Sequence, residues 1–195
     1  MTSLSFEEQA DALLACGAAT DAARLREALR SAGVREWPDR SVVSPSREIM
    51  PVARAAVSVK RAGRPVVLGH LEPGELERFE PIEGLVIPDA PAYVATDVDL
   101  GAASRNVTPE AALRDLRAAG RSPLTLDEGI ALMLVQPEAI ARNWGFSMAG
   151  SRCGDQRVPA FWVSEGRPKL GWCWDRNPHT WLGTASCAAR RTRPG

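Results

Sequence analysis

Apolar positions recur every three to four residues near the start of the chain, which is the period of an amphipathic α-helix. The first predicted helix covers residues 6–16 and begins after Ser5, which forms a capping-box sequence with Glu8. The second predicted helix covers residues 21–32, and a glycine follows each of the two segments as a stop signal. Together they predict a helical hairpin over residues 1–35.

Residues 36–51 show neither a helical nor a strand period, and they contain three prolines and three serines. These residue types interrupt helices and strands, so we expect a linker or loop before a second domain at residues 52–195. In this domain, apolar stripes and cap residues predict helices at residues 52–62, 73–79, 108–119, 125–136 and 137–144. Short apolar runs between turn formers predict strands at residues 65–70 and 93–98.

From residue 146 onward the helical period disappears. Short aromatic segments alternate there with Gly, Pro, Asp and Asn, a pattern typical of strands joined by turns. The predicted strands cover residues 146–150, 158–164, 169–174 and 180–185. We interpret them as an antiparallel meander. The fold class predicted is α+β, with an N-terminal helical hairpin, central helices with short strands, and a C-terminal antiparallel meander packed on helices.

Composition is that of a globular protein, with 45% hydrophobic and 25% charged residues. No apolar stretch approaches the roughly 20 residues needed to cross a bilayer, and the N-terminal segment lacks the basic and then apolar order of an export signal. We therefore expect a cytoplasmic protein without a membrane partner. In that compartment the four cysteines are expected to be reduced thiols.

The formal net charge is zero, but the charges are unevenly distributed along the chain. From residue 150 onward eight basic residues stand against three acidic ones, whereas the rest of the chain has 16 basic and 21 acidic residues. Because local potential governs the encounter with charged ligands, the C-terminal part is the expected host for anions. The alternative is a frayed basic tail formed by Arg190, Arg191 and Arg193.

Chemically versatile side chains are concentrated in residues 171–187, which hold three of the six tryptophans, two of the four cysteines and one of the two histidines. Strand alternation predicts that Trp172 and Trp174 share one face and that Cys173 lies on the other. Gly171 is expected to leave open space beside the Cys173 thiol, where a ligand or another backbone segment can approach.

One hypothesis is an enzyme for acyl or thiol transfer or hydrolysis, with Cys173 as the nucleophile and His179 as the general base. The turn-forming residues before His179 deliver the imidazole beyond the strand end, and Asn177 or Asp155 is available to orient its ring. The simpler alternative is that Cys173 is a small buried hydrophobic residue, which is the commoner role of a strand cysteine.

Metal binding has weaker support in the sequence. The ligand types of tetrahedral zinc occur at Cys153, Cys173, His179 and Cys187. These cysteines lack the close pair that structural zinc sites contain, so we expect no metal and no cofactor. Asp97 and Asp99 have spacing that suits magnesium or calcium, but acids before a glycine such as Gly101 are commonly solvated or capping.

A polar turn at residues 150–157 places Arg152 and Arg157 around Asp155. A bidentate pair between one arginine and Asp155 would stiffen the turn and leave the second arginine to hold a carboxylate or phosphate. A structural network of ion pairs is the alternative. The residues expected to bind a ligand are Arg152, Arg157, Trp172, Asn177 and Trp181.

Four runs carry a family resemblance: GRSPLTLDEG at 120–129, GSRCGDQRVP at 150–159, PKLGWCW at 168–174 and NPHTWLG at 177–183. They resemble an uncharacterised actinobacterial family, a domain of unknown function, over about residues 65–190, and the hairpin is a looser match. The resemblance implies no activity. It implies a signature made of Arg152, Asp155, Arg157, Trp172, Cys173, Asn177, His179, Trp181 and Cys187. Cys153 departs from that signature.

Three functions therefore remain open. The first is a binding protein that holds a small anionic or aromatic ligand, or a partner peptide, at a site in the meander lined by Trp, Arg and His. The second is the enzyme that uses Cys173 and His179. The third is single-stranded nucleic-acid binding, in which tryptophans stack on bases. The sequence leaves the oligomeric state undetermined.

Overall fold

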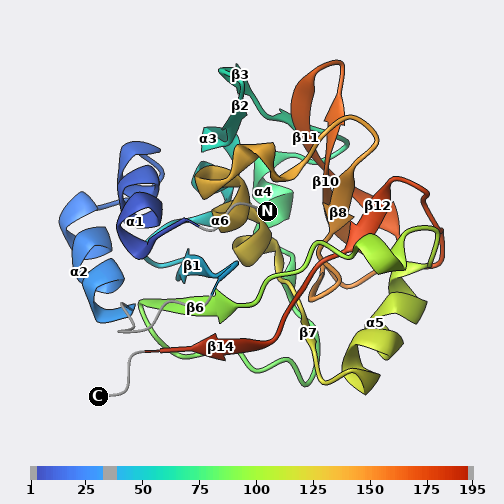
Figure 1. Ribbon diagram of the computed structural model, residues 1–195. Coiled ribbons are helices and arrows are strands. Elements are labelled where there is room, and N and C mark those ends of the chain that lie inside the picture. Colours follow the sequence, from blue (N-terminus) through green and yellow to red (C-terminus); the bar gives the residue numbers. More distant parts are fainter. Residues whose placement is uncertain (1–3, 33–38, 193–195) are drawn as a thin grey trace.

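The computed structural model describes residues 4–32 and 39–192 (Figure 1). It combines helices with several small sheets, so the predicted α+β class is confirmed. Residues 33–38 of the predicted hairpin and linker, and Arg193 of the predicted basic tail, lie outside the described residues. None of the described helices has the length and apolar run needed to cross a bilayer.

A three-stranded antiparallel sheet has the strand order β1 (Val42–Pro45), β6 (Ala92–Thr96) and β14 (Ala189–Arg191). The linker or loop predicted for residues 36–51 is wrong at β1, because Val42 and Val43 are buried and paired with β6. β1 lies at the edge of the sheet, where a proline at the strand end is tolerated.

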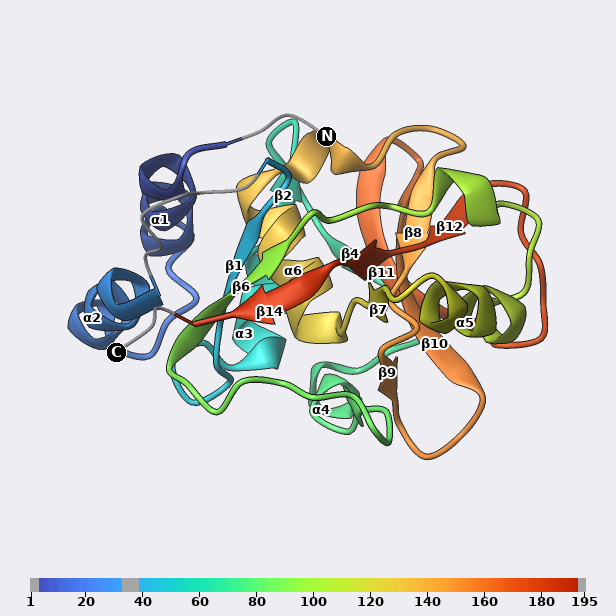
Figure 2. The same cartoon turned by 60° about the horizontal axis from the view of Figure 1, so that its bottom comes forward.

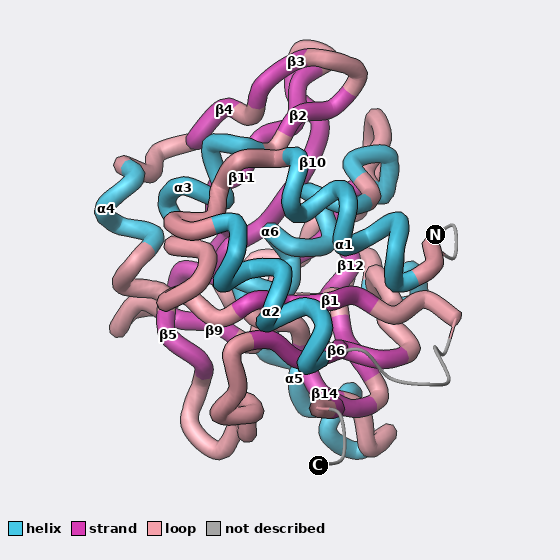
Figure 3. Tube along the Cα trace, turned by 90° about the vertical axis from the view of Figure 1, so that its left-hand side faces the viewer, coloured by secondary structure: helices cyan, strands magenta, loops and turns pink. Residues whose placement is uncertain are grey.

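The predicted hairpin is present as α1 (Phe6–Ala15) and α2 (Ala22–Ala32). The Ser5 hydroxyl accepts from the Glu8 amide at 3.2 Å, and the Glu8 carboxylate accepts from the Ser5 amide at 2.8 Å, so the capping box is confirmed. Helix α2 lies against β1 and β6, and α1 lies against β1 (Figure 3). Three leucines of the hairpin belong to the main core, namely Leu13, Leu25 and Leu29.

The second sheet has the strand order β12 (Leu182–Thr184), β8 (Gly145–Ser147), β10 (Arg157–Ser164), β11 (Arg167–Trp174) and β4 (Val67–Leu68). β10 pairs antiparallel with β11 and with β8. β12 and β4 lie parallel to their neighbours, so the sheet is mixed and the antiparallel meander was only partly correct. Alternation within a strand shows which face a residue occupies, not which strand lies beside it.

Helix α6 (Leu126–Val135) lies between the two sheets (Figure 2). Its apolar residues occupy every side of the helix, as expected of a helix buried in a core. The predicted capping box at its start is confirmed, because the Thr125 hydroxyl accepts from the Glu128 amide at 3.3 Å.

Arg190 in β14 is part of the core and not of a frayed tail. Its Nε donates to Glu128 Oε1 at 2.6 Å, and the two side chains are 5% and 0% exposed. One of the positive charges counted at the C-terminal end is therefore neutralised inside the molecule.

The remaining helices are α3 (Val52–Ser58), α4 (Pro73–Leu76), α5 (Pro109–Ala118), η1 (Ala102–Ser104) and η2 (Pro137–Ala139). The remaining strand pairs are β2 (Lys60–Arg61) with β3 (Arg64–Pro65), β5 (Glu80–Pro81) with β9 (Ser151–Arg152), and β7 (Ser122–Pro123) with β13 (Ser186–Cys187). The helix predicted over residues 137–144 is wrong beyond η2. Asn143 has a φ of 60°, and the chain turns there so that Ala141 and Trp144 pair.

Candidate functional site

The residues predicted for the site are divided between β11, the turn at residues 150–157 and the segment that follows β11. In β11, Trp172 and Trp174 share one face with their ring centroids 4.7 Å apart, and Cys173 lies on the other, as alternation predicted. Cys173 joins a small apolar cluster with Ala149, Val158, Ala160 and Leu182.

The Cys173 thiol is poorly placed to act as a nucleophile. Its residue is 7% exposed, and burial raises the pKa of the thiol to about 12, so the reactive thiolate is scarce at neutral pH. The open space expected beside Gly171 is filled. A Cβ at that position would lie 2.5 Å from the Trp162 ring and 2.9 Å from the Gly69 carbonyl oxygen. Glycine is therefore needed for the close approach of an indole.

His179 lies with Trp181 rather than with the thiol. The two ring centroids are 5.2 Å apart, and the His179 carbonyl accepts from the Asn106 amide at 2.9 Å. Partial burial lowers the pKa of the His179 imidazole, which keeps the ring neutral at pH 7. No hydrogen bond joins the imidazole to Cys173 in the described part of the chain. Asn177 is exposed in the preceding turn.

The polar turn contains the predicted ion pair. Asp155 accepts from the amide and Nε of Arg157, both at 2.8 Å, and from the Cys153 thiol at 3.2 Å. Burial opposes ionisation of Asp155, but these hydrogen bonds outweigh it and lower the pKa of the carboxyl. Arg157 lies over the Trp172 ring, 5.7 Å from its centroid. Arg152 instead donates to the carbonyls of Ala149 and Ser151, each at 2.9 Å.

Asp97 and Asp99, the two acids with spacing that suits a metal ion, also have arginine partners. Asp97, which has a φ of 49°, binds Arg40 and accepts from Arg121 at 2.8 Å, and the Arg121 hydrogen bond is the largest cause that lowers its pKa. Asp99 accepts from the Gly101 amide at 2.6 Å. Within residues 4–32 and 39–192, no group of three or more His, Cys, Asp or Glu side chains is placed to hold a metal ion.

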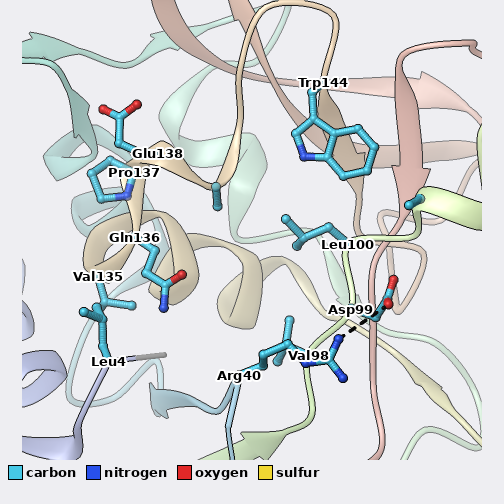
Figure 4. Close-up of a pocket in the computed structure, with 12 residues that line it drawn as sticks. Leu4, Arg40, Val98, Asp99, Leu100, Val135, Gln136, Pro137, Glu138 and Trp144 are labelled. Atoms are coloured by element: carbon cyan, nitrogen blue, oxygen red, sulfur yellow. Dashed lines mark ion pairs between the residues drawn. The ribbon is translucent and has the colours of Figure 1, made fainter. Parts of the chain in front are cut away.

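A cavity of about 570 Å³ lies between the end of α6, η2 and the segment after β6, and its lining residues do not include β11 (Figure 4). We call it the η2 pocket. Its apolar wall is formed by Leu4, Val98, Leu100, Val135, Pro137 and Ala139. The Trp144 indole closes one side, across from Gln136 and Pro137.

Charged side chains at the η2 pocket are held in pairs. Arg40 binds Asp97, and its Nη1 lies 3.9 Å from the Asp99 carboxylate (Figure 4). Glu138 pairs with Arg61 at 2.6 Å. The interior is therefore mainly apolar, and polar groups stand at its border.

A smaller hollow of about 150 Å³ also has Trp144 in its wall and is lined by one of the predicted residues, Trp181. Trp181 and Trp162 meet edge to face with centroids 5.7 Å apart, and Trp144 completes the wall. The Lys169 ammonium lies 5.7 Å from the Trp162 centroid. Trp181 and His179 are thus grouped with Trp162, away from Arg157 and its turn.

Comparison with known proteins identifies a family. The sequence model of a family of unknown function (DUF5701) matches residues 6–193. The chain belongs to this family. No curated protein and no solved structure matches the chain. The expected resemblance to an uncharacterised domain is confirmed, and the match begins at residue 6, so the helical hairpin is part of the DUF5701 sequence.

Sequence reasoning missed the η2 pocket of this DUF5701 protein. Its lining comes from the N-terminal segment, the strand entry at Arg40, the 98–102 segment, the end of α6 and Trp144. Residues 137–144 were expected to be one helix, which would place Trp144 on a helical face. The one local signal was Pro137, which ends α6 and begins the turn that forms the pocket.

Proposed function

We propose that this DUF5701 protein binds a small organic molecule in the η2 pocket. The observation that carries the proposal is the cavity of about 570 Å³ with an apolar wall, a tryptophan on one side and polar groups at its border. Pockets for small ligands have volumes of roughly 300–1,000 Å³ and this mixed lining. The volume suits a small molecule better than a folded partner.

The wall indicates the body of the ligand. Val98, Leu100 and Val135 offer aliphatic surface, and Trp144 offers a flat indole. A flat apolar ring system can stack on or against the edge of Trp144 while it displaces water from the aliphatic side. Arg40, Asp99 and Gln136 are polar groups that line the same pocket.

The two other functions have less support. Catalysis by Cys173 requires a thiolate that burial opposes. Stacking of single-stranded nucleic acid requires several tryptophans open to solvent, and in the described residues Trp174, at 45%, is the one exposed tryptophan. The observations therefore favour binding over chemistry at β11.

The direct test uses phenylnaphthylamine, a neutral aromatic probe that fluoresces in apolar surroundings. We expect saturable binding to the full chain. Ala102 is an exposed residue that lines the pocket, so Ala102→Phe adds a ring to the cavity without disturbing the core. This variant should weaken binding about tenfold or more, equal to about 1.4 kcal/mol.

Ala118→Phe is the matched control, because Ala118 is an exposed alanine on α5 away from the pocket. It should leave probe binding unchanged. Equal binding by wild type and Ala102→Phe, or no saturable binding to wild type, contradicts the proposal. A metabolite screen by thermal shift can then identify the natural ligand, since a ligand at a hundred times its Kd adds about 2.7 kcal/mol of stability.

A further inference from the structure

The charges around the η2 pocket indicate more than an apolar ligand. We infer that the ligand carries an anionic group of the carboxylate, sulfonate or phosphate type, and that Arg105 binds this group. The inference rests on the proposed function. It follows from the position of Arg105 and from the ion pairs that the neighbouring charges already make.

Arg105 is held beside the pocket by Trp144. The guanidinium carbon lies 3.9 Å from the centroid of the Trp144 ring, and Trp144 lines the pocket. The backbone supports the same placement, because Arg105 directly follows η1 and the first residue of η1, Ala102, also lines the pocket. The guanidinium thus stacks on the indole that closes one side of the cavity, although Arg105 itself does not line it.

Arg105 differs from Arg40, which lines the pocket, and from Arg61, which pairs with a lining residue. Arg40 is paired with Asp97 and lies near Asp99, and Arg61 is paired with Glu138. Among residues 4–32 and 39–192, by contrast, no carboxylate forms an ion pair with Arg105. An anion can therefore bind Arg105 without breaking an existing pair, whereas an anion at Arg40 must compete with two carboxylates.

The acids of the pocket do not repel such a ligand strongly. The Asp99 carboxylate accepts a hydrogen bond from the Gly101 amide at 2.6 Å and lies 3.9 Å from an Arg40 nitrogen, so its charge is partly compensated. Glu138 is compensated by Arg61 at 2.6 Å. These acids are paired, whereas no carboxylate in the described part of the chain pairs with Arg105, so Arg105 adds an uncompensated positive charge beside Trp144.

Stacking also prepares Arg105 for this role. A guanidinium over an indole face is attracted by the ring quadrupole and keeps its edge free, and that edge carries the N–H groups that bind an anion in a bidentate way. Because the side chain is already ordered on Trp144, less rotamer entropy is lost when the anion binds. A ligand with a flat body beside Trp144 and an acidic group at one end satisfies both features.

The test compares two probes with the same aromatic body. Anilinonaphthalene sulfonate carries an anionic group, and phenylnaphthylamine is neutral. We expect wild type to bind the sulfonate about tenfold more tightly, since a charge-assisted hydrogen bond adds roughly this much. Sodium chloride should reduce the affinity for the sulfonate and leave that for the neutral probe unchanged.

Arg105→Gln should abolish the preference for the sulfonate and leave the affinity for phenylnaphthylamine unchanged, and Arg105→Lys should keep part of the preference. Arg114→Gln is the control, because Arg114 is an exposed arginine of α5 and lies away from Trp144. It should change neither affinity. Ala102→Phe should weaken both probes, which assigns their binding to the pocket.

The outcomes separate the two proposals. If the neutral probe binds in the pocket but the sulfonate binds no more tightly, or Arg105→Gln keeps the preference, the anionic ligand is wrong and the proposed function stands. If neither probe binds, or Ala102→Phe leaves both affinities unchanged, the pocket function is wrong and the inference with it.

Discussion

Replacement of Arg190 by methionine is expected to destabilise the fold by about 3–5 kcal/mol, the usual cost of leaving a buried charge unpaired. Arg190 donates to both carboxylate oxygens of Glu128, at 2.6 and 2.9 Å, to Ser122 Oγ at 2.5 Å and to the Pro123 carbonyl at 2.9 Å. Methionine fills much of the same apolar volume, so the cost comes mainly from the Glu128 charge. That carboxylate would keep the Thr125 amide, at 2.8 Å, as its partner.

The Glu128 side chain is 0% exposed, so water cannot solvate the charge, and the carboxylate loses it only by taking up a proton, which also costs free energy at neutral pH. For a chain of this size, the expected loss lowers the Tm by roughly 10 °C. Urea unfolding followed by tryptophan fluorescence measures the change, and an unchanged m-value shows that the unfolded state is the same. Arg191→Met is the matched control, since Arg191 is the exposed neighbour in β14 and should leave the midpoint unchanged.

A double variant separates lost charge pairing from lost packing. Glu128→Gln removes the buried charge and keeps the helix cap, because glutamine also serves in a capping box. Arg190→Met with Glu128→Gln should therefore be more stable than Arg190→Met alone, by about 1–3 kcal/mol. A cost of less than about 1 kcal/mol for Arg190→Met, or additive destabilisation by the two substitutions, contradicts the buried Glu128 charge as the cause.

Three further predictions follow from close packing and buried ionisable groups. Gly183→Ala should destabilise by about 1–3 kcal/mol and weaken phenylnaphthylamine binding, because its Cβ would lie 2.2 Å from the carbonyl oxygen of Leu100, a pocket residue. Gly74→Ala, whose Cβ meets nothing within 4 Å, is the control, and equal stability of both variants contradicts the steric argument. Since the pKa of the Cys173 thiol is raised to about 12, the unfolded chain ionises first, and the free energy of unfolding should fall as pH rises from 9.0 toward that value. Urea unfolding of Cys173→Ala should show a shallower decline, and an identical decline would count against burial as the cause. The pKa of the His179 imidazole is lowered from 6.5, so its contribution to stability is present above that pH and is lost as pH falls through the folded pKa. Titration of the His179 ring by NMR should give a midpoint below 6.5, and a midpoint at or above that value contradicts the effect of burial on its pKa.

Local patterns in the sequence were sufficient for much of the secondary structure. The capping boxes at Ser5 and Thr125 form as predicted, and the helices that they begin start where expected. Trp172 and Cys173 lie on opposite faces of β11. These features depend on backbone geometry within a few contiguous residues, so the sequence contains the information in one place.

The neighbours of each element were decided by tertiary packing. β1 forms in a segment rich in proline and serine because it is buried against β6, and β12 joins the second sheet in parallel after a loop. The same packing buries the Cys173 thiol, fills the space beside Gly171 with an indole, and draws Arg190 into an ion pair.

The candidate site shows the same division. The α+β class, the capped helices and the faces of the tryptophan-rich strand could be predicted from the sequence, because each follows from a short local pattern. The η2 pocket combines side chains from residue 4 to residue 144. No local pattern connects such distant positions, and only the burial of apolar surface from several elements together brings them around one cavity.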